Sequence, residues 1–136
     1  MTNYCVDKDV AERLVKSGWK KETKWYWING ISETIILCSK ETLDSCREDK
    51  QPIEDWDIFP APLSDEIIKV LPSYINNGEH DSLWLTIEKS ESGYRVFYSA
   101  VEPSSNKATI TKIFADKKLS HALANMWIWL KENKYI

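Results

Sequence analysis

The chain has 136 residues, of which 43% are hydrophobic and 29% are charged, and its formal net charge is −3. This balance excludes a disordered chain, and the length is enough for one domain whose core needs no metal or disulfide. Duplex-binding domains usually carry a clear positive excess, so the charge argues against nucleic acid as a partner. We expect a single domain spanning residues 1–136.

Cysteine usage and the first residues indicate the compartment. Cys5, Cys38 and Cys46 are odd in number and form no Cys-x-x-Cys pair. Free thiols in a reducing compartment are the simplest interpretation, and a disulfide between two of them stays open. The N-terminus shows no basic segment followed by an apolar core, and no apolar run is long enough to cross a bilayer. We therefore expect a cytoplasmic protein that makes no membrane contact.

The first element in chain order is a short helix at residues 6–17, with apolar residues at helical spacing. Asp7 is placed to cap its start, and Gly18 is placed to end it in a left-handed conformation. We expect Trp19 to fold back onto Leu14 at this end.

A hairpin is predicted next. The dipeptide Asn29-Gly30 separates two β-rich runs within residues 24–38, and this dipeptide favours a two-residue turn. In that register Trp25 and Trp27 share one face with Ile36.

Residues 39–62 are expected to form a loop. The part up to residue 57 is rich in acids, has room for one helical turn at 41–47, and fits no EF-hand, whose ligands alternate around a central glycine. Two prolines keep residues 59–62 extended. The functional interpretation is an acidic patch for a protein partner, for which we single out Asp55, Trp56 and Asp57.

The second half is predicted as a helix, three strands and a helix. Ser64 is placed to cap a helix that ends before Pro72. Alternating apolar residues then predict an antiparallel meander. Its strands are 83–88, 94–101 and 108–114. Apolar residues at every third or fourth position from Leu119 to Leu130 predict a long amphipathic helix that packs across the strands.

Together these elements predict an α+β fold. An antiparallel sheet, made of the N-terminal hairpin and the three-stranded meander, would be packed by the C-terminal amphipathic helix, with two shorter helices beside it. Within the one domain we distinguish residues 1–38 (helix plus hairpin), 39–62 (acidic loop) and 63–136 (helix, three strands, helix).

Two segments resemble a group of small uncharacterised phage and prophage proteins. They are Pro60-Ala61-Pro62-Leu63-Ser64-Asp65-Glu66 with Leu71-Pro72, and Ala122 to Leu130 with Glu132-Asn133. The motifs are structural in character, and the group offers no catalytic residues to carry over. The resemblance implies a phage or prophage protein of unknown function inside a bacterial host cell.

Residues 63–133 also resemble the double-stranded-RNA-binding domain in their order of helix, three strands and helix. Lys117 and Lys118 precede the last helix, where that family has basic residues. The short turn at 90–93 lacks the family's Gly-Pro-x-His loop, and the segment has no basic excess. The resemblance therefore implies RNA binding only as an alternative function.

No assembled catalytic or metal-binding set is visible in the sequence, which has neither a glycine-rich phosphate loop nor a Gly-x-Ser-x-Gly elbow. Glu79-His80-Asp81 is a compact acid–base cluster, but it needs a second histidine or acid cluster, and His121 falls on the polar side of the last helix. Cys38 and Cys46 have no paired base. We predict a protein that is not an enzyme and carries no cofactor or metal.

Seven tryptophans predict an aromatic core, an aromatic contact surface, or both. Ile128 lies opposite the apolar stripe of the last helix and is flanked by Trp127 and Trp129. Either the first helix and hairpin cover this side, or another chain does. We predict that these three residues bind a partner or a second copy of the chain.

A second patch mixes cations with aromatics, as in surfaces that stack bases and follow a phosphate chain. It comprises Lys16, Lys20, Lys21, Lys24 and Trp25. The competing interpretation places the tryptophans in the core and the lysines in solvent around them.

The function we predict is therefore a non-enzymatic phage or prophage accessory protein that binds a protein partner through an aromatic-rich surface, with a homodimer as one form of it. The alternatives are a nucleic-acid-binding module and a protein that sequesters a small ligand to counter host defence.

Overall fold

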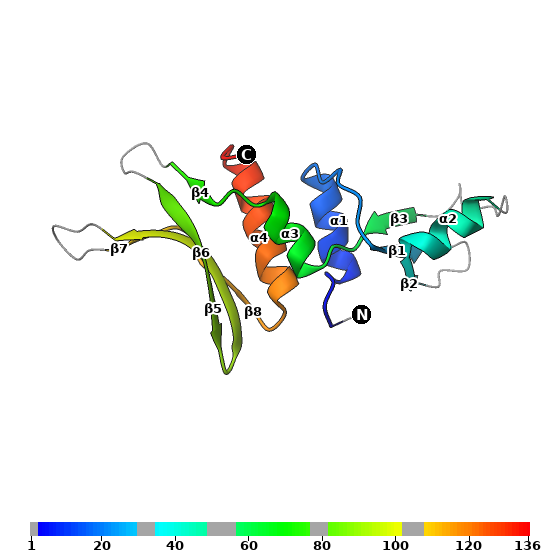
Figure 1. The fold of residues 1–136 in the computed structure, drawn as a ribbon, viewed down its shortest axis with the longest axis horizontal. Helices are drawn as coiled ribbons and strands as arrows, with labels where there is room; N and C mark the ends of the chain where they lie inside the picture. The colour runs from blue at the N-terminus through cyan, green and yellow to red at the C-terminus, as the bar shows by residue number, and fades with distance from the viewer. Residues whose placement is uncertain (1–2, 30–34, 49–56, 77–81, 102–107) are drawn as a thin grey trace.

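The structure is a computed structural model that describes residues 3–29, 35–48, 57–76, 82–101 and 108–136. These residues form an α+β fold of four helices and two antiparallel sheets (Figure 1), which confirms the predicted fold class. The helices are α1 (Lys8–Lys16), α2 (Lys40–Glu48), α3 (Ser64–Val70) and α4 (Leu119–Glu132). The strands are β1 (Trp25–Asn29), β2 (Ile35–Ser39), β3 (Asp57–Pro60), β4 (Tyr74–Ile75), β5 (Leu83–Ser90), β6 (Gly93–Val101), β7 (Ala108–Ile110) and β8 (Phe114–Asp116).

The larger sheet has the strand order β4-β5-β6-β7, and β8 pairs with β6 further along. Helix α4 lies across one face of this sheet and contacts β6 and β8, while α3 and α1 pack against α4. Figure 1 shows these three helices between the larger sheet and the smaller one. The main hydrophobic core fills the space around α4, because residues from the three helices and from β4, β5, β6 and β8 converge there.

Helix α1 ends as the sequence predicts. Gly18 adopts a φ of 102°, which an L-residue rarely adopts, and the N–H of Trp19 donates to the carbonyl of Leu14 at 2.9 Å. The Trp19 ring and Leu14 are both buried in the main core. Asp7 occupies the N-cap position, but its carboxylate makes no capping hydrogen bond and instead accepts from Lys118 Nζ at 2.7 Å.

The N-cap of helix α3 lies one residue earlier than we predicted. Leu63, not Ser64, is the N-cap residue. The carboxylate of Glu66 accepts from the N–H of Leu63 at 3.0 Å and from the N–H of Lys24 at 3.1 Å. Glu66 therefore satisfies a free donor at the helix start and also ties α3 to the segment before β1.

The third predicted strand is divided in two by a bulge. Ser99 pairs with Ile110 and Val96 with Phe114, so three residues of one strand, 111–113, lie opposite two residues of β6. Thr111 holds the bulge: its N–H donates to the carbonyl of Tyr98 at 3.0 Å, and its hydroxyl accepts from the N–H of Tyr98 at 2.9 Å.

The smaller sheet corrects the predicted hairpin register. Strands β1 and β2 pair with Ile28 opposite Ile36 and Asn29 opposite Ile35, which leaves five residues between the strands instead of two. Ile36 therefore shares a face with Ile28 and not with Trp25 and Trp27. The connection itself, residues 30–34, lies outside the described residues.

The expected acidic loop is largely regular where it is described. Helix α2 covers Lys40–Glu48, and β3 pairs with β1 along Asp57–Pro60. Leu43 of α2 is buried against Ile28 and Cys38 in a small second core. The helical turn predicted at 41–47 is confirmed and lies within α2, and the extended chain predicted at 59–62 is confirmed where it forms the end of β3. The rest of the loop prediction is wrong at these residues, because α2 has an apolar side chain to bury and β1 has a free edge to pair.

Candidate functional site

The two faces of the larger sheet differ. Val96 and Tyr98 of β6 point into the main core beneath α4. Phe97 and Ser99 alternate with them and belong to the opposite face. No described helix lies on that opposite face in Figure 1.

Four residues form one cross-strand row on this outer face. Tyr74 pairs with Trp84, Trp84 with Ser99, and Ser99 with Ile110. We call Tyr74, Trp84, Ser99 and Ile110 the outer row. Tyr74 is 50% exposed, Trp84 56% and Ile110 47%. Three large apolar side chains about half exposed therefore lie in one row across four neighbouring strands, with Ser99 between Trp84 and Ile110.

Contacts within the sheet fix the middle of the outer row. The rings of Tyr74 and Trp84 lie 5.3 Å apart between centroids at an interplanar angle of 50°. The hydroxyls of Ser99 and Thr86 are hydrogen-bonded at 3.0 Å. Because these side chains are held by their neighbours, the row is a preformed surface.

The charges on this face lie to one side of the outer row. Arg95 and Glu88 are paired across β5 and β6 in the register, and Arg95 Nη1 lies 3.5 Å from Glu88 Oε2. The Arg95 guanidinium also lies 5.6 Å from the centre of the Phe97 ring. The outer row itself carries no ionisable group except the Tyr74 phenol.

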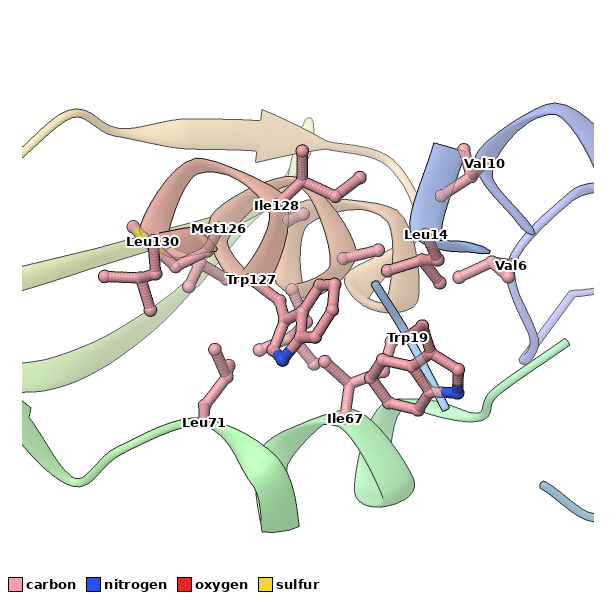
Figure 2. Close-up of a cluster of buried hydrophobic side chains, with 14 of the residues drawn as sticks. Val6, Val10, Leu14, Trp19, Ile67, Leu71, Met126, Trp127, Ile128 and Leu130 are labelled. Atoms are coloured by element: carbon pink, nitrogen blue, oxygen red, sulfur yellow. The ribbon is translucent and has the colours of Figure 1, made fainter. Parts of the chain in front are cut away.

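The predicted surface role of Trp127 and Ile128 is wrong for the folded chain. Trp127 is 6% exposed and Ile128 4% exposed, because α1 and α3 pack against α4. Figure 2 shows both side chains among core residues contributed by several elements. The sequence left open whether this side of the helix is covered by the same chain or by another one. In the structure it is covered by the same chain.

The third residue of that group, Trp129, is only partly buried. Its ring stacks on Tyr135 with centroids 5.4 Å apart and an interplanar angle of 25°. Its role in binding stays a prediction. In the acidic group, Asp55 and Trp56 lie outside the described residues, and Asp57 is an exposed residue at the start of β3, opposite Asn29.

The predicted lysine–tryptophan patch is distributed over separate places. Lys24 and Trp25 line a hollow of about 480 Å³ beside α2, together with Lys40, Glu41 and Asp44, so its charges are mixed. Lys20 and Lys21 line a different hollow of about 340 Å³ at the ends of α1 and α4. Lys16 is an exposed residue in the last turn of α1 and lines neither. The structure therefore does not assemble these five residues into one surface.

The cysteines are placed as free thiols. Burial raises the pKa values of Cys5 and Cys38 above that of an ordinary thiol, so these groups are less readily converted to thiolate. Cys46 packs beside Cys38 at the edge of the second core. Buried thiols with raised pKa values are typical of structural cysteines, not nucleophiles.

A polar cluster joins α1, β8 and α4. His121 Nε2 accepts from the N–H of Asp7 at 2.9 Å, and its Nδ1 lies 3.7 Å from Asp116 Oδ1. Lys118 donates through its N–H to Asp116 at 2.8 Å. Within the described ranges, no group of three or more histidine, cysteine or acidic side chains is placed to hold a metal ion. His80, the other histidine, lies outside the described residues.

The outer row was missed because its members come from strands that only pairing brings together. The sequence does place Trp84 on the opposite side from Leu83 and Leu85, which is the one signal that could have pointed to it. Strand β4 has two residues, too few for any alternation to show.

No family model matches the chain, and no match was found among curated proteins or among solved structures. In the part of the chain that the structure covers, none of the helices has the length and apolar character needed to span a membrane.

Proposed function

We propose that the protein is a non-enzymatic binding protein that holds a protein partner through the outer row. The observation that carries this proposal is the alignment of Tyr74, Trp84 and Ile110, each about half exposed, on the sheet face opposite α4. Single exposed apolar residues are normal, but an ordered row of them on one face is typical of an interaction site.

The chemistry of the row favours a protein over a nucleic acid. Protein interfaces have centres that are poor in charge and rich in tyrosine and tryptophan, which is the composition seen here. A phosphate chain would need uncompensated cations, whereas Arg95 at the side of the row is already paired with Glu88. The partner we propose therefore presents an apolar surface with polar groups at its rim.

The non-enzymatic part of the proposal is supported by the buried state of Cys5 and Cys38, whose raised pKa values do not favour a thiolate nucleophile. A phage or prophage setting, with action inside the host bacterial cell, is proposed on the resemblance of the segments at 60–66 and 122–133. A homodimer formed by two outer rows is one form of the same proposal.

The test compares Trp84→Thr with a matched control, Ile36→Thr. Both replace an exposed strand residue by a β-branched polar one, and Ile36 lies on the other sheet with 48% of its surface exposed. The immobilised full chain and both variants are exposed to bacterial extract, and retained proteins are quantified. Sedimentation equilibrium of the same three proteins measures self-association.

We expect one protein, or the chain itself, to bind the parent and Ile36→Thr alike and to bind Trp84→Thr at least about tenfold more weakly, as for loss of an interface hot spot. Retention that both variants preserve equally would remove the outer row from the interaction.

A further inference from the structure

A hollow on the side of α4 that faces away from the sheet is lined by lysines. It has a volume of about 340 Å³, at the lower end of the ~300–1,000 Å³ found for small-molecule pockets. Lys20 and Lys21, just after α1, line one part of it, and Lys131 of α4 lines another. Val70 of α3, Trp127 of α4 and Ile136 supply apolar lining. We call this the basic hollow.

The lysines of the basic hollow carry uncompensated charge. Lys20, Lys21 and Lys131 are exposed, and none of them forms an ion pair within the described part of the chain. Lys131 Nζ lies over the Trp127 ring, 5.4 Å from its centre. The backbone carrying the other two is held in place, because the indole N–H of Trp19 donates to the carbonyl of Lys21 at 3.0 Å. Three positive charges therefore line one small hollow.

Trp127 contributes an unused donor to the same place. The residue is 6% exposed, yet its indole N–H has no acceptor among the described residues. Figure 2 shows the nitrogen of the Trp127 ring turned away from α4 and toward α3. The rest of the ring is fixed by an edge contact with Trp19, whose ring centre lies 5.2 Å away. Among the described residues, Ser120 Oγ is the side-chain polar atom that is fully buried without a partner, so the indole nitrogen of Trp127 keeps contact with solvent and is free to donate to an acceptor that enters the hollow.

We propose that the basic hollow binds the phosphate group of a small phosphate ester. One phosphate oxygen accepts from the indole N–H of Trp127, and the lysine ammonium groups balance the charge. A phosphate monoester carries close to two negative charges and three strong acceptor oxygens near neutral pH, which matches three cations better than a single carboxylate does. Lysine binds phosphate as a point charge and needs no fixed fork geometry. Val70 offers an apolar wall for the esterified part.

This site does not depend on the outer row. The outer row lies on the sheet face that α4 does not cover, whereas the basic hollow is formed by the ends of α1, α3 and α4. The two sites share no residue, so one proposal can fail while the other stands.

The test follows the seven indole N–H resonances of the ¹⁵N-labelled full chain during titration with inorganic phosphate and then with adenosine monophosphate. Sodium chloride keeps the ionic strength constant, because exposed lysines respond to salt. The variants are Lys20→Ala and Lys131→Ala, with Lys16→Ala as the matched control, since Lys16 is exposed on α1 but does not line the hollow. Lys21→Ala completes the set. Each of the four variants removes the charge of one exposed lysine and leaves the buried residues unchanged.

We expect the Trp127 indole resonance to shift saturably, with the monophosphate binding more tightly than inorganic phosphate. Removing any one lysine of the hollow should weaken binding by about tenfold, and Lys16→Ala should leave it within about twofold. No saturable shift of the Trp127 resonance, or equal weakening by Lys16→Ala, would overturn the proposal. In a parallel titration, a single-stranded oligonucleotide that moves the same resonance at lower concentration than the monophosphate would assign the site to a nucleic-acid chain instead.

Discussion

The backbone N–H of Asp7 donates a hydrogen bond of 2.9 Å to Nε2 of His121. This contact joins the N-cap of α1 to the first turn of α4, two places 114 residues apart in the sequence. The N–H groups at a helix start have no partner within the helix, so an acceptor from another element stabilises both the helix and its position. His121 therefore has a structural task at the junction of two helices.

We predict that His121→Ala lowers the free energy of unfolding by about 1 kcal/mol, because the Asp7 N–H loses its protein acceptor and must bond to water instead. His121→Gln is the matched variant, since its amide oxygen can accept in place of the imidazole nitrogen. Urea unfolding followed by tryptophan fluorescence measures both. If the two variants lose the same stability, the hydrogen bond is not what His121 contributes.

Gly18 and Gly93, the glycines with positive φ in the described part of the chain, should respond differently to alanine. At Gly93, with φ 137°, an added Cβ would lie 2.5 Å from the carbonyl oxygen of Asp116, which belongs to the backbone of β8. At Gly18, with φ 102°, a Cβ would meet nothing within 4 Å. Gly18→Ala should therefore cost about 1 kcal/mol of backbone strain alone.

Gly93→Ala must in addition move β8 away from the β5–β6 turn, and we expect it to cost at least about 2 kcal/mol. Thermal unfolding of both variants gives the comparison. Equal losses would show that β8 yields freely, which would contradict the tight pairing of Tyr94 with Asp116.

The elements that could be predicted from sequence are those whose signal is local. The apolar spacing in α4 and the Gly18 terminator gave correct elements because each depends on neighbours within a few residues. Strands β5 and β6 were found for the same reason, since their alternation runs over eight and nine residues.

What could not be predicted depends on pairing between distant segments. The Asn29-Gly30 signal favoured a two-residue turn, but strand β1 also pairs with β3, and the observed register places Ile28 and Cys38 over Leu43 of α2. The bulge at Thr111 cannot be recognised from the alternation of apolar residues along the strand, because it depends on the hydrogen bonds to Tyr98 of β6. The outer row and the basic hollow were out of reach for the same reason, because each combines residues from three or more elements.

Replacing an exposed tryptophan and replacing a buried one should change the free energy of unfolding by very different amounts. Trp84→Thr should change the free energy of unfolding by less than about 1 kcal/mol, because the ring is 56% exposed and threonine suits a strand. Trp19→Ala should cost about 3–5 kcal/mol, because that ring is 4% exposed and packs on Trp127.

Urea unfolding of the two variants under the same conditions provides the measurement. A large loss for Trp84→Thr would mean that the outer row is needed for folding, and its exposure would then have another explanation than a binding role.

Tyr98 should make stability depend on alkaline pH. Its ring is fully buried, its hydroxyl donates to the carbonyl of Pro72 at 2.7 Å, and burial raises the pKa of Tyr98 well above the ordinary value of 10.0. The native state therefore keeps the proton at a pH where the unfolded chain releases it. Since the unfolded state then binds fewer protons than the native state, the free energy of unfolding falls as pH rises. The contribution is complete below pH 10.0 and should decline by about 1.4 kcal/mol at one pH unit above it.

Comparison with Tyr98→Phe isolates this effect from the titration of the lysines, which both proteins share. Below pH 9 we expect the parent to be more stable by about 1 kcal/mol, because the variant leaves the Pro72 carbonyl without its donor. Between pH 10 and pH 11 this advantage should disappear, since phenylalanine has no proton to lose. Tyr74→Phe, at a half-exposed ring on the outer row, serves as the control for tyrosine replacement in general. A difference between parent and Tyr98→Phe that stays constant from pH 8 to pH 11 would mean that the buried phenol ionises as easily in the folded chain as in the unfolded one, and the hydrogen bond to Pro72 would then not hold its proton.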